Sequence, residues 1–112
     1  MEYNYQYMDK ISKLIILRMA SLKTIESSYQ FNKIFMHIGS IASATRLLDE
    51  LEQEKLISHE GIYDKDPSFY KKIKITEEGE NYLQENLKNI SFSNTEFNEH
   101  RIDLLNKIFG LS

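Results

Sequence analysis

The sequence predicts a mostly helical α+β fold that forms a single domain. Apolar residues recur at helical spacing as far as Leu56, at every second position from there to Ile75, and at helical spacing again after Thr76. The chain has 112 residues, which is enough for one domain with a modest core. Hydrophobic residues make up 41% of the chain and charged residues 28%, a balance typical of a folded, soluble protein.

The segment from Ser40 to Leu56 is the helix around which the chain is organised. Ser40 follows Gly39 and suits the N-cap, because its hydroxyl can accept a hydrogen bond from an amide of the first turn. One face is apolar and holds Ile41, Ala44, Leu47, Leu48 and Leu51. The other face begins with Ala42, Ser43, Thr45 and Arg46 and ends with Asp49, Glu50, Glu52 and Glu54. This asymmetry suits a helix whose first turns enter a DNA groove, although an ordinary surface helix has the same apolar stripe.

Two helices are expected before this segment. The first runs from Asp9 to Leu22, with a core stripe of Ile11, Leu14, Ile15, Met19 and Leu22. In front of it, alternating tyrosines predict that residues 1–8 form a short strand or an extended arm, which is either a partly ordered tail or a contact with a second subunit. The second helix starts at a capping box of Ser27 and Gln30 and ends near Ile38. The short turn around Gly39 then makes a helix-turn-helix arrangement.

A β-hairpin and two more helices complete the chain. Residues 57–63 and 69–75 alternate as strands around a polar turn that holds the single proline, and the second strand presents Lys72 and Lys74 opposite Ile73 and Ile75. Thr76 is expected to cap the next helix. A final helix is expected from Thr95 to Phe109, ended by Gly110. Its apolar side exceeds the need of one small domain, so residues 91–112 are predicted to form a dimerisation element beside a domain at residues 9–90.

This order of elements predicts a winged helix-turn-helix domain with N-terminal and C-terminal helices. The segments IGSIASATRLLDELEQEKLI and ITEEGENYL resemble the small bacterial winged-helix regulators of the MarR and PadR type. In those families a glycine precedes the recognition helix, and a Thr-x-x-Gly segment opens the helix after the wing. The resemblance covers residues 11–87 and implies DNA binding, with terminal helices forming a dimer.

The resemblance also implies which residues would contact DNA. The exposed front of the recognition helix would meet the major groove, with Arg46 on guanine or phosphate: Ser40, Ala42, Ser43, Thr45 and Arg46. The wing would contact the backbone or the minor groove through Lys65, Lys71, Lys72 and Lys74. The start of the second helix would contact phosphate through Ser27, Ser28, Tyr29 and Lys33.

Function is expected to be non-enzymatic binding in the cytoplasm. The chain has no cysteine, its three histidines lie on separate elements, and no glycine-rich phosphate loop is present, so no cofactor or metal is expected. A homodimeric transcriptional repressor that binds double-stranded DNA is the first hypothesis. A plasmid or phage partition or replication adaptor is the second. The third is a winged-helix module for a protein partner, suggested by the net charge of −3.

Overall fold

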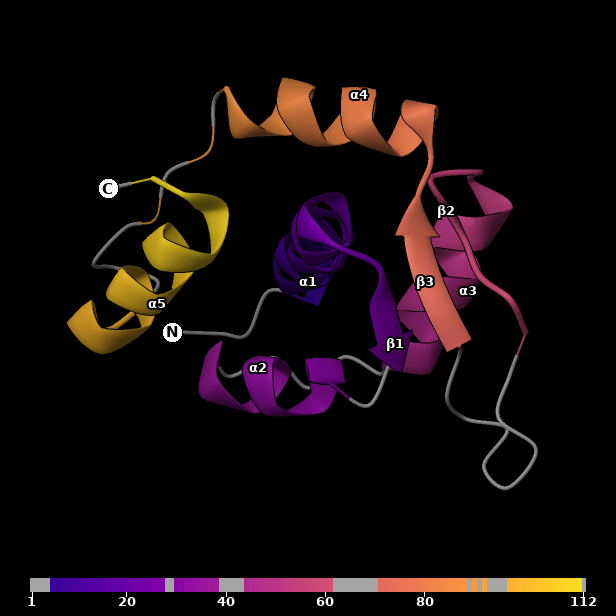
Figure 1. The fold of residues 1–112 in the computed structure, drawn as a ribbon. Helices are drawn as coiled ribbons and strands as arrows, with labels where there is room; N and C mark the ends of the chain where they lie inside the picture. Colours follow the sequence, from indigo (N-terminus) through magenta and orange to yellow (C-terminus); the bar gives the residue numbers. More distant parts are fainter. Residues whose placement is uncertain are drawn as a thin grey trace.

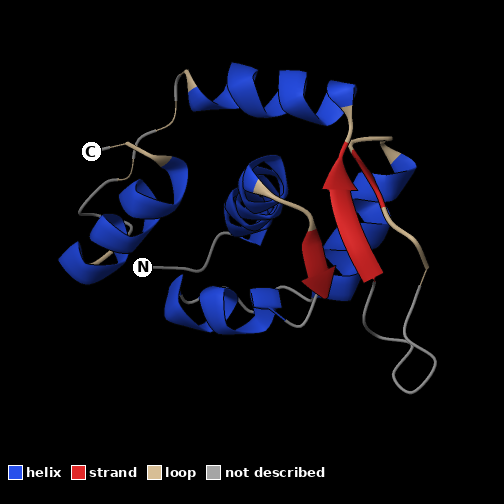
Figure 2. Ribbon diagram, in the orientation of Figure 1, coloured by secondary structure: helices blue, strands red, loops and turns tan. Residues whose placement is uncertain are grey.

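The computed structural model describes residues 5–27, 30–38, 44–61, 71–88, 90, 92 and 97–111. Its elements are, in chain order, α1 (Tyr5–Leu22), β1 (Ile25–Ser27), α2 (Gln30–Ile38), α3 (Ala44–Gln53), β2 (Ile57–Ser58), β3 (Lys71–Ile75), α4 (Glu77–Leu87) and α5 (Glu99–Phe109). The described part of the chain is mostly helical with a small antiparallel sheet, which confirms the α+β class (Figures 1 and 2).

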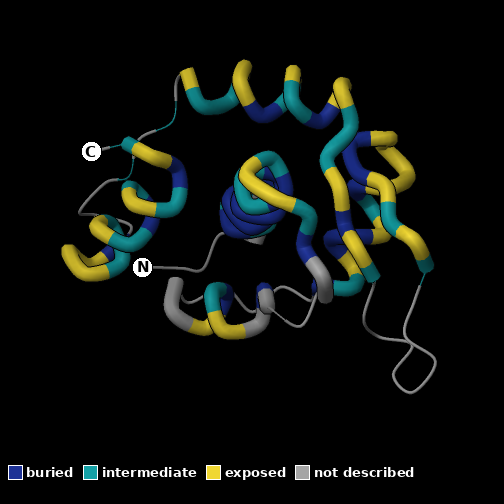
Figure 3. The backbone as a smooth tube through the Cα atoms, viewed as in Figure 1, coloured by how far each residue is buried: buried dark blue, intermediate teal, exposed yellow. Residues whose placement is uncertain are grey.

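Helix α1 lies at the centre, and the other elements surround it (Figure 1). Its apolar run Leu14–Leu17 is almost completely buried, so more than one stripe of this helix faces the core (Figure 3). The predicted core stripe was too narrow, because it left out Ile16 and Leu17. It was also wrong at Leu22, which is 65% exposed at the end of the helix.

The start of α1 corrects the predicted N-terminal arm. The helix begins at Tyr5, four residues before the predicted start, so Tyr5 and Tyr7 belong to a helix and not to an extended segment. Tyr7 packs beside Phe97, with ring centroids 6.2 Å apart. The alternating tyrosines of this segment suggested an extended backbone, but the contact of Tyr7 with Phe97 is made from a helix.

The sheet has the order β1-β3-β2, with β3 paired antiparallel to both neighbours. Ser27 is the last residue of β1 and pairs with Lys71, so it does not cap α2 as predicted, and α2 begins at Gln30. Within β3, Ile73 is buried and the flanking Lys72 and Lys74 are exposed, which confirms the predicted alternation. The described strands of the hairpin are shorter than predicted, and residues 62–70 lie outside the described part.

The C-terminus of α3 is joined to the N-terminus of α4 by hydrogen bonds. Helix α3 ends in a Schellman motif, in which the Leu56 amide donates to the Leu51 carbonyl at 2.9 Å and Lys55 has a positive φ of 63°. The Thr76 hydroxyl donates to the Lys55 carbonyl at 2.7 Å and accepts from the Gly79 amide at 3.0 Å. Thr76 is therefore the predicted N-cap, and it also connects the two helices.

Replacing Lys55 with glycine is expected to raise the free energy of unfolding by about 1 kcal/mol, because a residue with a Cβ is strained at positive φ. Urea denaturation measures this change. Lys55→Ala is the matched control, since it shortens the same exposed side chain without relieving the backbone. Equal stabilities of the two variants would show that the backbone at residue 55 is not strained.

Helix α5 packs on α1 within the same chain. Leu105 and Phe109 are buried, and Arg18 Nε of α1 donates to the Ile108 carbonyl at 3.2 Å, near the C-terminus of α5. Gly110 ends the helix at a φ of 71°, as predicted, whereas the N-cap is Asn98 and not the predicted Thr95. Much of the apolar side that suggested a dimer seam is thus covered by the chain's own core.

Candidate nucleic-acid interface

Helix α3 presents one buried and one exposed face. Its buried residues, all predicted, are Ala44, Leu47, Leu48 and Leu51. Because successive helical residues rotate by about 100°, the opposite direction is occupied by Arg46, Asp49 and Gln53, all of which are exposed. These three residues are the part of α3 that could meet a flat or grooved partner within the described residues.

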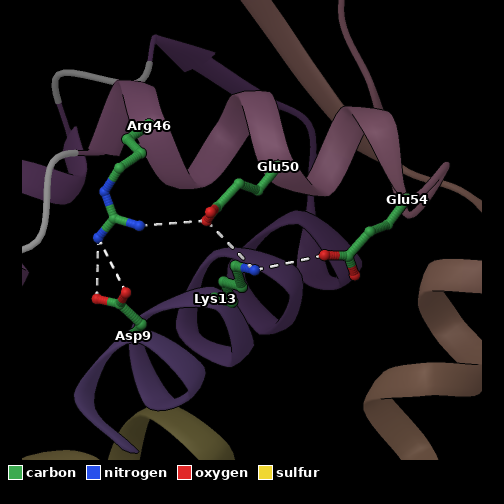
Figure 4. A network of polar contacts seen from close by, with 5 residues as sticks. All are labelled: Asp9, Lys13, Arg46, Glu50 and Glu54. Atoms are coloured by element: carbon green, nitrogen blue, oxygen red, sulfur yellow. Dashed lines mark hydrogen bonds and ion pairs between the residues drawn. The ribbon is translucent and has the colours of Figure 1, made fainter. Parts of the chain in front are cut away.

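Arg46 does not extend freely from this face. Its Nη2 atom lies 3.0 Å from both carboxylate oxygens of Asp9 on α1, and its Nη1 atom lies 3.3 Å from Glu50 Oε2 (Figure 4). Lys13 of α1 lies 3.3 Å from Glu50 and 3.4 Å from Glu54. The resemblance implies that Arg46 contacts guanine or phosphate, whereas in the structure its guanidinium is turned toward α1.

The charge of this exposed region is acidic overall. The five residues of the network in Figure 4 carry two positive and three negative charges, and Asp49 and Glu52 add two further exposed acids on α3. Half-exposed pairs such as Arg46 with Asp9 contribute only about 0–1 kcal/mol, so the network does not dominate stability. Its main effect is to neutralise the single arginine of α3.

The base of the hairpin carries two exposed cations, Lys72 and Lys74. Lys72 and Lys74 of β3 point away from the core, and Lys71 is half-buried. The Glu60 amide donates to the Lys71 carbonyl at 2.9 Å, and the Lys71 amide donates to the Gly61 carbonyl at 2.8 Å. These bonds extend the pairing of β3 beyond the end of β2, and Lys72 beside them has a positive φ of 48°.

His59 ties this hairpin base to α3. The Gly61 amide donates to His59 Nδ1 at 2.9 Å, so Nδ1 acts as an acceptor, and the ring can donate from Nε2 to the Glu52 carboxylate. The sequence pattern places His59 and Glu52 on different elements and gives no sign of this contact.

The structure brings together only part of the predicted interface. Lys33 is exposed on α2 and Thr45 is half-buried in the first turn of α3. The remaining predicted residues lie outside the described part, and their placement is not tested: Ser28, Tyr29, Ser40, Ala42, Ser43 and Lys65. The described candidates therefore come from α2, α3 and β3, with Arg46 already paired.

The described residues form a cavity but no candidate metal site. In these ranges no group of three His, Asp or Glu side chains is arranged to hold a metal ion. A half-open cavity of about 310 Å³ lies between α1 and α4, with Ile11 and Leu14 among its apolar residues and Lys10 and Asn86 among its polar ones. No helix in the described part is long and apolar enough to cross a membrane.

Comparisons with known proteins identify no relative. Neither protein-family models, nor curated proteins, nor solved structures match this chain.

Proposed function

We propose that the protein is a winged-helix protein that binds double-stranded DNA and acts as a transcriptional repressor. The observation that carries the proposal is the sheet order β1-β3-β2 combined with the chain order of α1, β1, α2 and α3. In this arrangement an amphipathic helix follows a second helix after a short connection, and a hairpin comes next. This is the order expected of a winged helix-turn-helix domain.

The exposed lysines support the same proposal. Lys72 and Lys74 lie on β3, and residues 61–76 carry four lysines against two aspartates. Cations on a hairpin can neutralise phosphates, and phosphate contacts set orientation and affinity without reading sequence. A repressor of this kind would act in the cytoplasm.

A homodimer completes the proposal, because one copy offers few cations. Two copies on a two-fold site would combine two weak contacts into tight binding. Buried Leu105 and Phe109 are not available for a seam, so the candidate seam residues are the half-buried ones on and after α5: Ile102, Leu104, Ile108 and Leu111. Sedimentation equilibrium measures the stoichiometry, and a monomer at micromolar concentration would contradict this part of the proposal.

A second candidate function is supported by the acidic face of α3. With Arg46 paired to Asp9 and Glu50, the exposed acids Asp49 and Glu52 would repel DNA phosphates. The same face would suit a basic protein partner.

An adaptor that coats repeated DNA sites in partition or replication is a variant of the first function. Cooperative binding to arrays of sites would distinguish this adaptor from a repressor.

Selection of duplexes from a random pool tests the proposed function. The protein is mixed with duplexes of about 30 base pairs, roughly three helical turns, and bound DNA is amplified and sequenced over several rounds. Enrichment of a two-fold symmetric sequence is the expected result. Absence of any enrichment, with no binding even at low salt, would reject DNA binding and favour the protein-partner function.

A further inference from the structure

The contact between Asp9 and Arg46 determines what Arg46 can reach. The Arg46 Nη2 atom lies 3.0 Å from each Asp9 oxygen, and Nη1 faces Glu50. Arginine recognises guanine by presenting two donors together to O6 and N7. Both terminal nitrogens of Arg46 already face carboxylates, so in this conformation the guanidinium is not presented for such a contact.

Asp9 is the acid that holds Arg46, and Glu50 has a smaller part. Glu50 also lies 3.3 Å from Lys13, so it keeps a cation if Arg46 leaves. Among the described residues, Arg46 is the ion-pair partner of Asp9 (Figure 4). The Arg46 side chain is 47% exposed and that of Asp9 27%, and pairs with such exposure are weak enough for a phosphate or base to displace.

We propose that Asp9 is a positioning residue that holds Arg46 back in the free protein, and that DNA must displace Asp9 before Arg46 contacts a base. The inference rests on the proposed DNA-binding function. The outward position of Arg46 on α3, opposite Ala44, Leu47, Leu48 and Leu51, gives the released side chain a route to a groove. Displacing Asp9 costs the same free energy on every sequence, so Asp9 lowers the affinity for all duplexes and leaves the ratio between the correct and a random sequence unchanged.

The test compares Asp9→Asn with wild type on the duplex selected above and on a random duplex. Asp9→Asn is expected to bind both about three- to fivefold more tightly, since release of Arg46 no longer breaks an ion pair. Asp9→Glu retains the charge and is expected to stay close to wild type. Glu54→Gln is the matched control, because it makes the same charge change on the same network but contacts Lys13 and not Arg46.

Repeating the comparison in an Arg46→Ala protein separates the effect of Asp9 on Arg46 from the general effect of removing a negative charge. In that background Asp9→Asn is expected to gain no more affinity than Glu54→Gln gains. A gain that persists without Arg46, or equal gains from Asp9→Asn and Glu54→Gln, would overturn the inference. If every variant binds DNA with the wild-type affinity, only the role of Asp9 is rejected. If none binds at low salt, the proposed function is rejected with it. Thermal unfolding confirms that each variant is folded.

Discussion

Replacing Gly79 with alanine is expected to lower the free energy of unfolding by about 2–3 kcal/mol. A Cβ atom at this position would lie 2.1 Å from the Leu56 carbonyl oxygen and 2.7 Å from Ile75 Cγ1. The carbonyl belongs to the backbone and accepts a hydrogen bond from the Thr76 amide at 3.0 Å, so it cannot move without breaking the connection between α3 and α4. Overpacking of this kind costs about 1–3 kcal/mol and more where backbone must shift. Urea denaturation gives the change directly.

Two control variants isolate the steric effect at Gly79. Gln84→Ala lies on the exposed side of the same helix and is expected to change stability by less than about 0.5 kcal/mol. Gly61→Ala adds a Cβ that meets no atom of the described residues within 4 Å, so among these residues it reports the strain of its φ of 116°. If Gly79→Ala is as stable as wild type, helices α3 and α4 do not approach each other as described.

Neutralising Lys72 and Lys74 together is expected to weaken DNA binding about tenfold or more at low salt. Each exposed lysine that contacts a phosphate releases about one counterion, so the slope of log affinity against log salt should fall by about 2. Asparagine is chosen at position 72 because it tolerates the positive φ of 48°, and glutamine at position 74. Fluorescence anisotropy on the selected duplex across a salt series measures both quantities.

The matched control for this pair is Lys88→Gln with Lys107→Gln. It removes the same charge from the C-cap of α4 and from α5, and α5 lies on the opposite side of α1 from the sheet (Figure 1). Its affinity and salt slope are expected to stay close to wild type. Equal losses in both double variants would mean that net charge, and not contact through β3, controls binding.

Features set by neighbouring residues were predictable from the sequence. The buried face of α3, the alternation around Ile73, the Thr76 cap and the Gly110 stop each depend on residues within one turn or one strand step. At these positions the local preference and the tertiary structure agree. Lys72 and Lys74 were predicted on the side of β3 opposite Ile73 for the same reason, and both are exposed.

Features set by distant residues were not predictable. Alternating tyrosines suggested an extended arm, but Tyr7 packs beside Phe97 from the other end of the chain. Ser27 has the side chain of a helix cap, yet its backbone pairs with Lys71 in the sheet. The Arg46 partner Glu50 is visible at helical spacing, whereas Asp9 lies 37 residues away in sequence and only the fold brings it close. Among the described candidate residues, Arg46 is the one whose surroundings the sequence could not predict.

The requirement for Gly79 lies between these cases. The Thr-x-x-Gly segment is visible in the sequence, and its threonine is a recognisable cap. The reason for glycine is the Leu56 carbonyl, which comes from the end of α3 and is placed by the Schellman motif there. The Thr-x-x-Gly segment thus identified position 79 in the sequence. The reason that a side chain does not fit there is visible only once α3 and α4 are packed together.

An NMR titration of isotope-labelled protein with the selected duplex tests DNA binding by this surface most directly. Amide signals of α3, of β3 and of Lys33 on α2 are expected to shift or broaden as DNA is added, while signals of α5 stay unchanged. Release of Arg46 from Asp9 should also move the side-chain signal of Arg46 Nε. Shifts confined to α4 and α5, or no shifts at low salt, would contradict binding through α3 and β3.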